Sequence, residues 1–243
     1  MDNPTAAKIM IKSLDLTSLN HNDTPETITT LCKKAETKIG NVAAVCVYPE
    51  FIGIALREVP QGVKIATVVN FPSGDNDLKT VEKEIKKVIK AGADEIDAVL
   101  PYKKLIDGDE IYCRQYLQMC RNCCEGKTLK IIIESGELKS TLLIRKATQI
   151  CIEEGADFVK TSTGKTKVSA TPEAANAILE VIKASGKDVG FKASGGIKKT
   201  EDAKKYLVLA NVILGNNWLS QKHFRIGASS VLDDLLKTIE QGF

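Results

Sequence analysis

Short apolar runs rich in β-branched residues recur along the chain, and longer stretches of helix-forming composition separate most of them. Short runs of this kind, bounded by turn-forming residues, are typical of buried strands. Eight runs fit the description: Ala43–Tyr48, Lys64–Phe71, Glu95–Leu100, Leu129–Ser135, Asp157–Ser162, Val189–Ser194, Asn211–Gly215 and Phe224–Ala228.

The stretches between these runs predict amphipathic helices. The clearest is Leu78–Ala91, where apolar residues repeat at helical spacing and lysines fill much of the opposite face. Thr171 followed by Pro172 predicts the start of another helix. Threonine is a preferred N-cap residue, and proline suits the first helical position.

The alternation of strands and helices predicts an α/β fold with a parallel sheet, because parallel strands need a crossover between them. Eight such units in 243 residues predict a single domain over residues 1–243 with a TIM (β/α)8 barrel. An open doubly wound sheet is the alternative, but no GxGxxG turn follows the first run. The region before Ala43 predicts an extra N-terminal helical segment, with Asp23 or Thr24 as its cap.

The composition is that of an ordinary globular protein, with 43% hydrophobic and 27% charged residues and a net charge of +3. The charge is spread along the chain, so nothing indicates a nucleic acid or an anionic membrane as a partner. The N-terminal region has no apolar signal segment, and no apolar run approaches the roughly 18 residues that span a bilayer. We therefore expect a soluble, cytoplasmic protein.

The seven cysteines predict reduced thiols, because their number is odd and the chain is not small. Cys120 and Cys123 form a CxxC pair, but a metal site would need a second pair or nearby histidines. Cys113, Cys120 and Cys124 share one face of a predicted helix, which favours core packing. We expect no metal and no cofactor.

Charged residues occur within several predicted strands, whose C-terminal ends carry the active site in a barrel of this kind. Asp97 lies on the third predicted strand, Lys130 and Glu134 on the fourth, Lys160 on the fifth and Lys192 on the sixth. Lysine is rarely buried without a partner or a purpose. One strand–helix unit separates the last two lysines, so they should lie on neighbouring strands.

Two neighbouring ammonium groups would favour the neutral amine. At about 6 Å and an effective dielectric constant near 20 they repel by roughly 2.8 kcal/mol, and burial acts in the same direction. A neutral lysine can attack an aldehyde and form an imine. The alternative is that carboxylates such as Asp97 or Glu134 neutralise Lys160 and Lys192. Spacing does not decide which lysine would be the nucleophile.

Glycine and hydroxyl clusters follow the predicted strands and indicate a phosphate site. Glycine lets backbone N–H groups approach phosphate oxygens, and the helix N-termini that follow favour an anion. Each cluster alone could be a simple turn, but all are expected at one end of the barrel. The clusters are Thr163–Lys165, Gly195–Gly196 and Gly227–Ser230.

Several segments resemble the signature segments of the deoxyribose-phosphate aldolase family, in order and over about Leu14 to Leu236. The lysine-containing segments are the most specific. The segments are Gly40–Pro49, Ala66–Gly74, Ala93–Tyr102, Gly155–Lys165, Val189–Ile197 and Arg225–Ser230.

The resemblance implies a class I aldolase that reversibly cleaves 2-deoxy-D-ribose 5-phosphate to acetaldehyde and D-glyceraldehyde 3-phosphate, in deoxyribonucleoside catabolism and without a metal. It implies that Lys160 forms the Schiff base, that Lys192 lowers its pKa and assists proton transfer, and that Asp97 joins the proton relay. It also implies a homodimer or a higher oligomer. The phosphate would bind at Gly164, Lys165, Gly195, Gly196, Ser229 and Ser230.

Other positions stay open. Asp15 and Asn20 match family positions near the site, but either residue could equally be a cap or a structural residue. Cys46 could line the pocket, although buried packing is the default for cysteine. Some family members end in a tyrosine proposed to help proton transfer, whereas this chain ends in Phe243.

Two other functions compete with the aldolase. One is a different barrel enzyme for a phosphosugar, either a transaldolase-like Schiff-base enzyme or an isomerase, and an isomerase needs no reducible imine. The other is a barrel that binds a phosphosugar without catalysis. Loss of either lysine or of Asp97 would favour the non-catalytic barrel, and all three residues are present.

Overall fold

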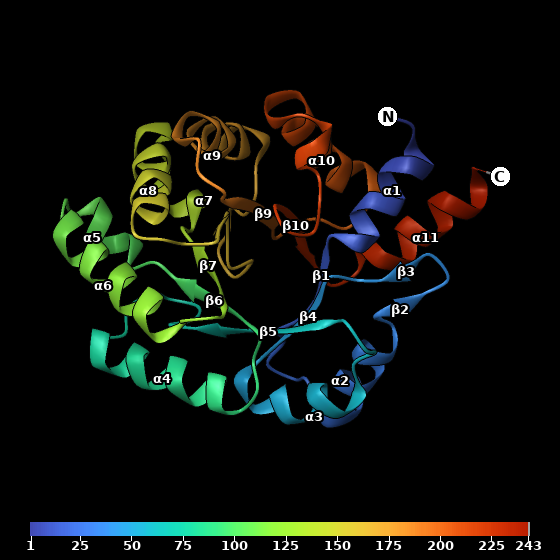
Figure 1. Cartoon of the computed structure of the whole chain (residues 1–243), viewed down its shortest axis with the longest axis horizontal. Coiled ribbons are helices and arrows are strands. Elements are labelled where there is room, and N and C mark those ends of the chain that lie inside the picture. Colours follow the sequence, from blue (N-terminus) through green and yellow to red (C-terminus); the bar gives the residue numbers. More distant parts are fainter. Residues whose placement is uncertain (243) are drawn as a thin grey trace.

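Eight parallel strands close into a barrel, with strand order β1-β10-β9-β8-β7-β6-β5-β4 (Figure 1). The computed structural model describes residues 1–242, so the C-terminal Phe243 lies outside the described residues. A separate hairpin joins β2 (Glu36–Thr37) to β3 (Gly40–Asn41). The barrel strands are β1 Leu14–Ser18, β4 Ala44–Val47, β5 Lys64–Val69, β6 Glu95–Val99, β7 Thr128–Ile132, β8 Phe158–Lys160, β9 Gly190–Ser194 and β10 Phe224–Ala228.

Helices surround the barrel and complete the predicted TIM (β/α)8 fold. Short 3-10 turns occur at Pro49–Phe51 and Asn216–Trp218. The helices are α1 Asn3–Lys12, α2 Pro25–Lys33, α3 Ile52–Glu58, α4 Leu78–Lys90, α5 Tyr102–Ile106, α6 Glu110–Cys123, α7 Ser135–Leu138, α8 Thr141–Glu153, α9 Pro172–Ser185, α10 Thr200–Leu214 and α11 Val231–Gln241.

The predicted helix starts are formed by local capping. Thr24 caps α2, with Pro25 as the first helical residue, and its hydroxyl accepts a hydrogen bond from Thr27 N at 3.3 Å. Thr171 caps α9 in the same way and accepts from Ala174 N at 3.1 Å. The amphipathic stretch predicted at Leu78–Ala91 is α4.

Two predictions about the N-terminal half and the seventh strand need correction. Residues Asn211–Gly215 do not form a strand, because Asn211 to Leu214 continue α10 and Val212 faces solvent. Their β-branched run resembles a strand, but the buried positions before it follow helical spacing. The true first strand is Leu14–Ser18, which the prediction had placed in the N-terminal helical segment. Of the predicted N-terminal helical segment, α1 precedes the first strand and packs against α10 and α11, whereas α2 follows β1.

This correction renumbers the strands that carry the candidate site. Asp97 lies on the fourth barrel strand, Lys160 on the sixth and Lys192 on the seventh.

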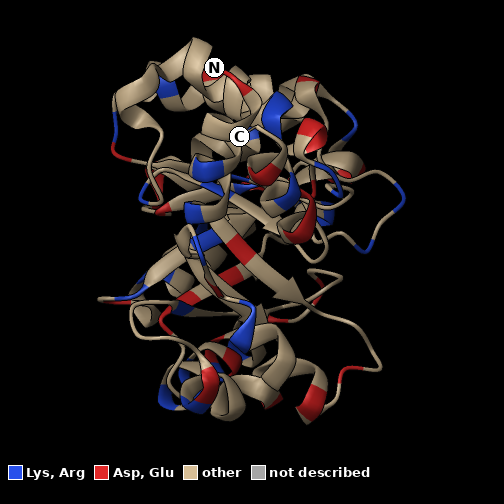
Figure 2. Ribbon diagram, turned by 90° about the vertical axis from the view of Figure 1, so that its right-hand side faces the viewer, with Lys and Arg blue, Asp and Glu red and all other residues tan. Residues whose placement is uncertain are grey.

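The side chains inside the barrel divide into two kinds. Lys130 and other charged residues occupy one part, whereas Ala44, Cys46, Ala66 and Val68 form a small apolar cluster. Figure 2 shows the acidic and basic positions on the strands that cross the middle of the molecule.

The cysteines are free thiols, and all except Cys123 are buried. Cys113, Cys120 and Cys124 lie in the main core, as predicted. Burial raises the pKa of the Cys113 thiol to about 12, so this thiol is a packing group at neutral pH.

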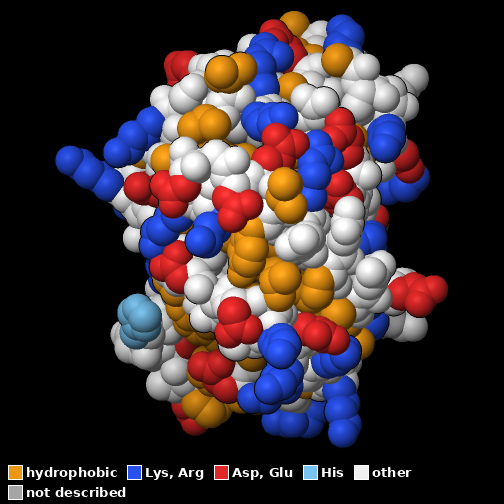
Figure 3. All heavy atoms as spheres, turned by 90° about the vertical axis from the view of Figure 1, so that its left-hand side faces the viewer, with side chains coloured by type: hydrophobic (Ala, Val, Ile, Leu, Met, Phe, Trp, Pro, Cys, Tyr) orange, Lys and Arg blue, Asp and Glu red, His pale blue; other side chains and the backbone are white. Residues whose placement is uncertain are grey.

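The outer surface mixes charges of both signs with scattered apolar side chains. Figure 3 shows this on the face that carries α5 and α6. The exposed apolar residues there include Ile106 and Ile111. No helix within residues 1–242 combines the length and the apolarity needed to cross a lipid bilayer.

Gly190 allows β8 and β9 to approach closely at the N-terminal end of the barrel. A Cβ at this position would lie 2.4 Å from Cε1 of Phe158 and 2.8 Å from the carbonyl oxygen of His223. We expect Gly190→Ala to lower the free energy of unfolding by about 1–3 kcal/mol, because the core must shift to accept the methyl group. Urea unfolding measures this change.

Gly53 provides a matched control. It lies in α3, and its nearest neighbour to a new Cβ would be Arg57 Nη1 at 3.9 Å. Gly53→Ala should raise the free energy of unfolding by about 0.5–1 kcal/mol, because alanine favours the helix. Changes of the same sign in both variants would contradict the account of Gly190.

Candidate active site

Three side chains from three strands meet inside the barrel. Lys160 is the last residue of β8, and its register partner on β9 is Lys192. Both Nζ atoms lie 2.7 Å from the same oxygen, Oδ2 of Asp97 on β6. The prediction that the two lysines occupy neighbouring strands is confirmed, and their register also puts them at one height. The structure brings Asp97 to both of them.

A wider ion-paired network continues towards the N-terminal end of the barrel. Lys130 Nζ lies 2.9 Å from Oδ1 of Asp97 and 2.6 Å from Oε2 of Glu95. Arg225 lies 2.6 Å from Oδ1 of Asp15 and 2.9 Å from Oε1 of Glu95. Asp15 also pairs with Lys192. All of these side chains are at least nine-tenths buried, so their charges are held by one another rather than by water.

The network contains one cation more than it has carboxylates. Its cations are Lys130, Lys160, Lys192 and Arg225, and its carboxylates are Asp15, Glu95 and Asp97. Within residues 1–242, Lys160 pairs with a single carboxylate, whereas each of the other three cations pairs with at least two. Loss of one proton from Lys160 makes the network neutral.

The pKa shifts follow this arrangement. Burial lowers the pKa of Lys160, and the neighbouring Lys192 ammonium lowers it further, although Asp97 acts in the opposite direction. Burial also opposes the charge of Lys192, but Asp15 and Asp97 outweigh it and raise the pKa of Lys192. Despite burial, Lys130, Lys160 and Lys192 hold the pKa of Asp97 well below its ordinary value. Lys160 is therefore the lysine that most readily becomes a neutral amine.

The alternative in which carboxylates neutralise the lysines is correct for part of the site. Asp97 contacts both Lys160 and Lys192, whereas Glu134 forms no ion pair among the described residues. The Glu134 carboxylate accepts hydrogen bonds from the backbone N–H of Thr163 and from the Thr163 and Thr166 hydroxyls, and burial raises its pKa. Glu134 thus holds the loop that follows β8 and lies outside the ion-paired network.

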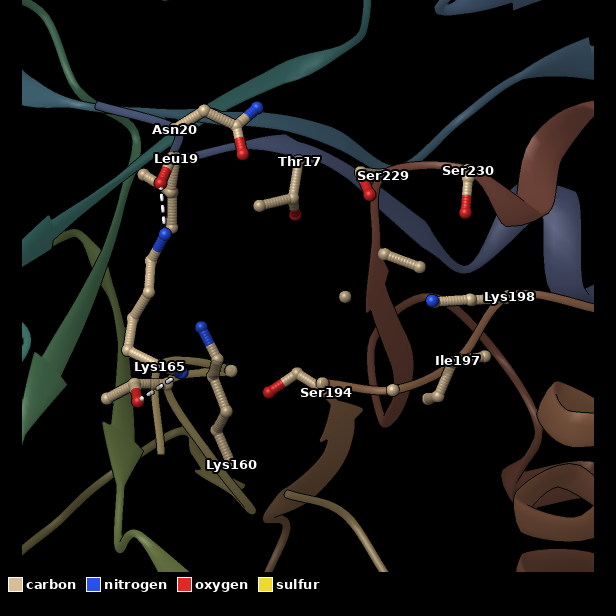
Figure 4. Close-up of a pocket in the computed structure, with 16 residues that line it drawn as sticks. Thr17, Leu19, Asn20, Lys160, Lys165, Ser194, Ile197, Lys198, Ser229 and Ser230 are labelled. Atoms are coloured by element: carbon tan, nitrogen blue, oxygen red, sulfur yellow. Dashed lines mark hydrogen bonds between the residues drawn. The ribbon is translucent and has the colours of Figure 1, made fainter. Parts of the chain in front are cut away.

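A pocket opens above Lys160 at the C-terminal ends of the strands. Figure 4 shows the Lys160 amine pointing into it, with Thr17 and Ser229 across the cavity. All six residues predicted to bind phosphate line this pocket. The structure therefore brings the three glycine and hydroxyl clusters together, as predicted.

The loops around the pocket depend on glycine. Gly164 and Gly195 both have positive φ values, and their backbones face each other closely, so that a Cβ on Gly195 would lie 3.1 Å from Cα of Gly164 and 2.5 Å from Cβ of Ser169. Ser230 stands at the start of α11, whose first backbone N–H groups favour an anion. Lys165 reaches across the pocket and donates a hydrogen bond to the carbonyl oxygen of Leu19 (Figure 4).

Two of the open positions now have a place. Asn20 lies in the loop after β1, where its side chain donates to Ser18 Oγ at 3.0 Å, and it also lines the pocket. Cys46 lies inside the barrel in the apolar cluster and does not line the pocket.

The structure adds Lys198, which was not predicted from the sequence. It lines the pocket, and its amine points into the cavity (Figure 4).

Sequence reasoning missed the charged layer beneath the site. This layer consists of Asp15, Glu95, Lys130 and Arg225. Asp15 is a buried member of it and not a cap, and no role was predicted for Glu95 or Arg225. A signal exists in the sequence for Asp15 and Arg225, because each is a charged residue flanked by apolar residues within a strand, whereas Glu95 follows Asp94 at the start of β6. In a barrel, such alternation places the charges on the inside.

Solved structures that resemble this chain include several aldolases. A proposed deoxyribose-phosphate aldolase from Coccidioides immitis shares 27% sequence identity, with a TM-score of 0.84 over 96% of this chain and 86% of that one. The aldolase QR15 shares 29% identity, with a TM-score of 0.80 over 94% and 96%. The tetrameric deoxyribose phosphate aldolase from Aeropyrum pernix, at 24% identity and a TM-score of 0.77 over 100% and 94%, supports the fold alone.

The sequence itself identifies the family. The family model described as DeoC/LacD family aldolase matches residues 9–237, which is nearly the whole chain and includes every residue of the site. The chain belongs to the DeoC/LacD family of aldolases.

Proposed function

We propose that this chain reversibly cleaves 2-deoxy-D-ribose 5-phosphate to acetaldehyde and D-glyceraldehyde 3-phosphate through a Schiff base on Lys160. The observation that carries the proposal is the position of Lys160, a buried lysine that pairs with one carboxylate among residues 1–242 and lies at the base of a pocket lined by glycines, serines and further lysines. The substrate class agrees with the description of the relative from Coccidioides immitis. The same proposal places the enzyme in deoxyribonucleoside catabolism and treats residues 1–243 as one catalytic domain.

The phosphate of the substrate would bind away from Lys160, at the glycine and serine clusters. Backbone N–H groups at Gly195 and Gly196 and the start of α11 at Ser230 supply donors there, and Lys165 and Lys198, which also line the pocket, supply positive charge. The open-chain sugar would then extend from this end of the pocket, which brings its C1 aldehyde to the Lys160 amine.

The chemistry begins when neutral Lys160 attacks C1 and forms a carbinolamine, which loses water to give a protonated imine. Removal of the C3 hydroxyl proton breaks the C2–C3 bond, releases D-glyceraldehyde 3-phosphate and leaves its electron pair in an enamine. Protonation of the enamine at C2 and hydrolysis of the imine release acetaldehyde and restore Lys160. The iminium itself is the electron sink, so the step requires no metal.

Asp97 and Lys192 are positioned to move these protons. Asp97 touches Lys160 through Oδ2, so it is placed to take protons from the amine and, through a water molecule, from the substrate. Lys192 touches the same oxygen and keeps a positive charge beside the reacting amine. This cation favours the neutral form of Lys160 before attack.

The assembly and location of the protein stay predictions. We expect a homodimer or a higher oligomer that acts on a small phosphorylated sugar in the cytoplasm, without nucleic acid or membrane partners. Size-exclusion chromatography with light scattering would determine the oligomeric state directly.

The first test is reductive trapping of the imine. Incubation with 2-deoxyribose 5-phosphate followed by sodium borohydride should give a stable adduct, seen by intact mass and mapped by peptide mass spectrometry to Lys160. Lys160→Met should abolish both the adduct and cleavage. An exposed surface variant, Lys86→Met, should form the adduct at the wild-type level.

The possible results separate the rival functions. An adduct on Lys192 would retain the aldolase class but reverse the roles of the two lysines. No adduct in folded wild-type protein would overturn the Schiff-base proposal and favour an isomerase or a binding-only barrel.

The second test concerns the phosphate site. We expect Lys165→Met to raise the KM for 2-deoxyribose 5-phosphate by about 10- to 100-fold, because a charge-assisted contact to the phosphate is lost. The kcat/KM for unphosphorylated 2-deoxyribose should change less than about twofold, because that substrate never makes this contact. Steady-state assays on both substrates measure the difference.

Lys167 is the matched control, since it is exposed two residues further along and does not line the pocket. Lys167→Met should leave both substrates close to wild type. An equal loss on both substrates in Lys165→Met would show that Lys165 supports the loop rather than the phosphate.

A further inference from the structure

The charged layer beneath the reacting lysine has no direct part in the proposed chemistry. Lys130 and Glu95 lie inside the barrel at 0% and 3% exposure, and neither lines the pocket. The four charged side chains of this layer are Asp15, Glu95, Lys130 and Arg225. Burying them costs free energy unless each is paired with an opposite charge.

We propose that Lys130 and Glu95 are positioning residues whose charges set the pH at which Lys160 becomes a neutral nucleophile. The inference rests on the proposed Schiff-base function and extends it to residues that do not touch the substrate. Lys130 acts through Asp97, because it binds Oδ1 while Lys160 binds Oδ2 of the same carboxylate. Glu95 acts through Lys130, which it contacts at 2.6 Å.

The direction of each effect follows from charge. The positive charge of Lys130 partly offsets the negative charge of Asp97, so Asp97 stabilises the Lys160 ammonium less than it would without Lys130. Without Lys130, the network would hold three cations and three carboxylates, and protonated Lys160 would be fully matched. Without the charge of Glu95, four cations would face two carboxylates, and the Lys160 ammonium would be less stable.

Other groups around Lys160 stay constant in these comparisons. Asp97 on β6, Lys192 on β9 and Cys46 on β4 act on its charge directly, and Glu134 after β7 also faces it. Asp15 on β1 and Arg225 on β10 complete the layer below, and Lys165 lies at the pocket. Since none of these is substituted, a change in the behaviour of Lys160 reports on Lys130 and Glu95.

The test is the pH dependence of imine trapping. Wild type and variants are mixed with 2-deoxyribose 5-phosphate and sodium cyanoborohydride from pH 5 to pH 9, and the rate of adduct formation is followed by intact mass. We expect the midpoint of the pH–rate profile to rise by about one pH unit in Lys130→Met and to fall by about one in Glu95→Gln, as expected for one charge inside the barrel.

The double variant tests the charge balance itself. Lys130→Met combined with Glu95→Gln removes one charge of each sign and should return the midpoint to within a few tenths of a pH unit of wild type. Lys86→Met makes the same chemical change on exposed α4 and should not move the midpoint. Circular dichroism confirms that each variant is folded.

The outcomes distinguish this inference from the proposed function. No adduct in wild type at any pH would remove the Schiff base and the inference with it. Normal adducts with unmoved midpoints, or with midpoints that move in the same direction in both single variants, would overturn the inference alone. If Lys130→Met does not fold, the Glu95→Gln variant alone still tests the proposal. A midpoint of its pH–rate profile that is unchanged or higher than in wild type contradicts the proposal.

Discussion

The carboxylate of Asp97 holds three lysine ammonium groups at one point inside the barrel, and the candidate site depends on this contact. Lys130 contacts its Oδ1 atom, whereas Lys160 and Lys192 both contact Oδ2. Each lysine alone would be costly to bury. Together with Asp15, Glu95 and Arg225 they form a network that is one cation in excess.

Closure of the barrel makes this network possible. Asp15 is on the first strand and Arg225 on the last, 210 residues apart, and they meet because β1 pairs with β10. The same closure brings the loops after β8, β9 and β10 around one pocket above the lysines. The charged layer therefore lies below Lys160, and the glycine-rich loops surround the pocket above it.

The sequence predicts much of this structure, and the errors have physical causes. The pattern of apolar runs identified seven of the barrel strands. Residue types identified the helix cap at Thr171 and left Asp23 and Thr24 as candidates for the cap that Thr24 forms. The apolar pattern placed a strand at Asn211–Gly215 because a β-branched run at a helix end resembles a short buried strand. The sequence offered both Asp97 and Glu134 as partners of Lys160, but spacing could not choose between them, because Asp97 lies 63 residues away and reaches Lys160 only through tertiary structure. Family resemblance named Lys160 as the nucleophile, and the ion-pair geometry gives a physical reason for it.

The most direct test of the central claim is the protonation state of Lys160 itself. A pH titration of lysine side-chain amines by nitrogen-15 NMR, with the signal assigned through Lys160→Met, reports it without substrate. The account predicts that Lys160 loses its proton below the ordinary lysine pKa of about 10.4, while Lys192 stays protonated above it. A Lys160 amine that titrates at or above 10.4, or a Lys192 amine that loses its proton first, would contradict the account.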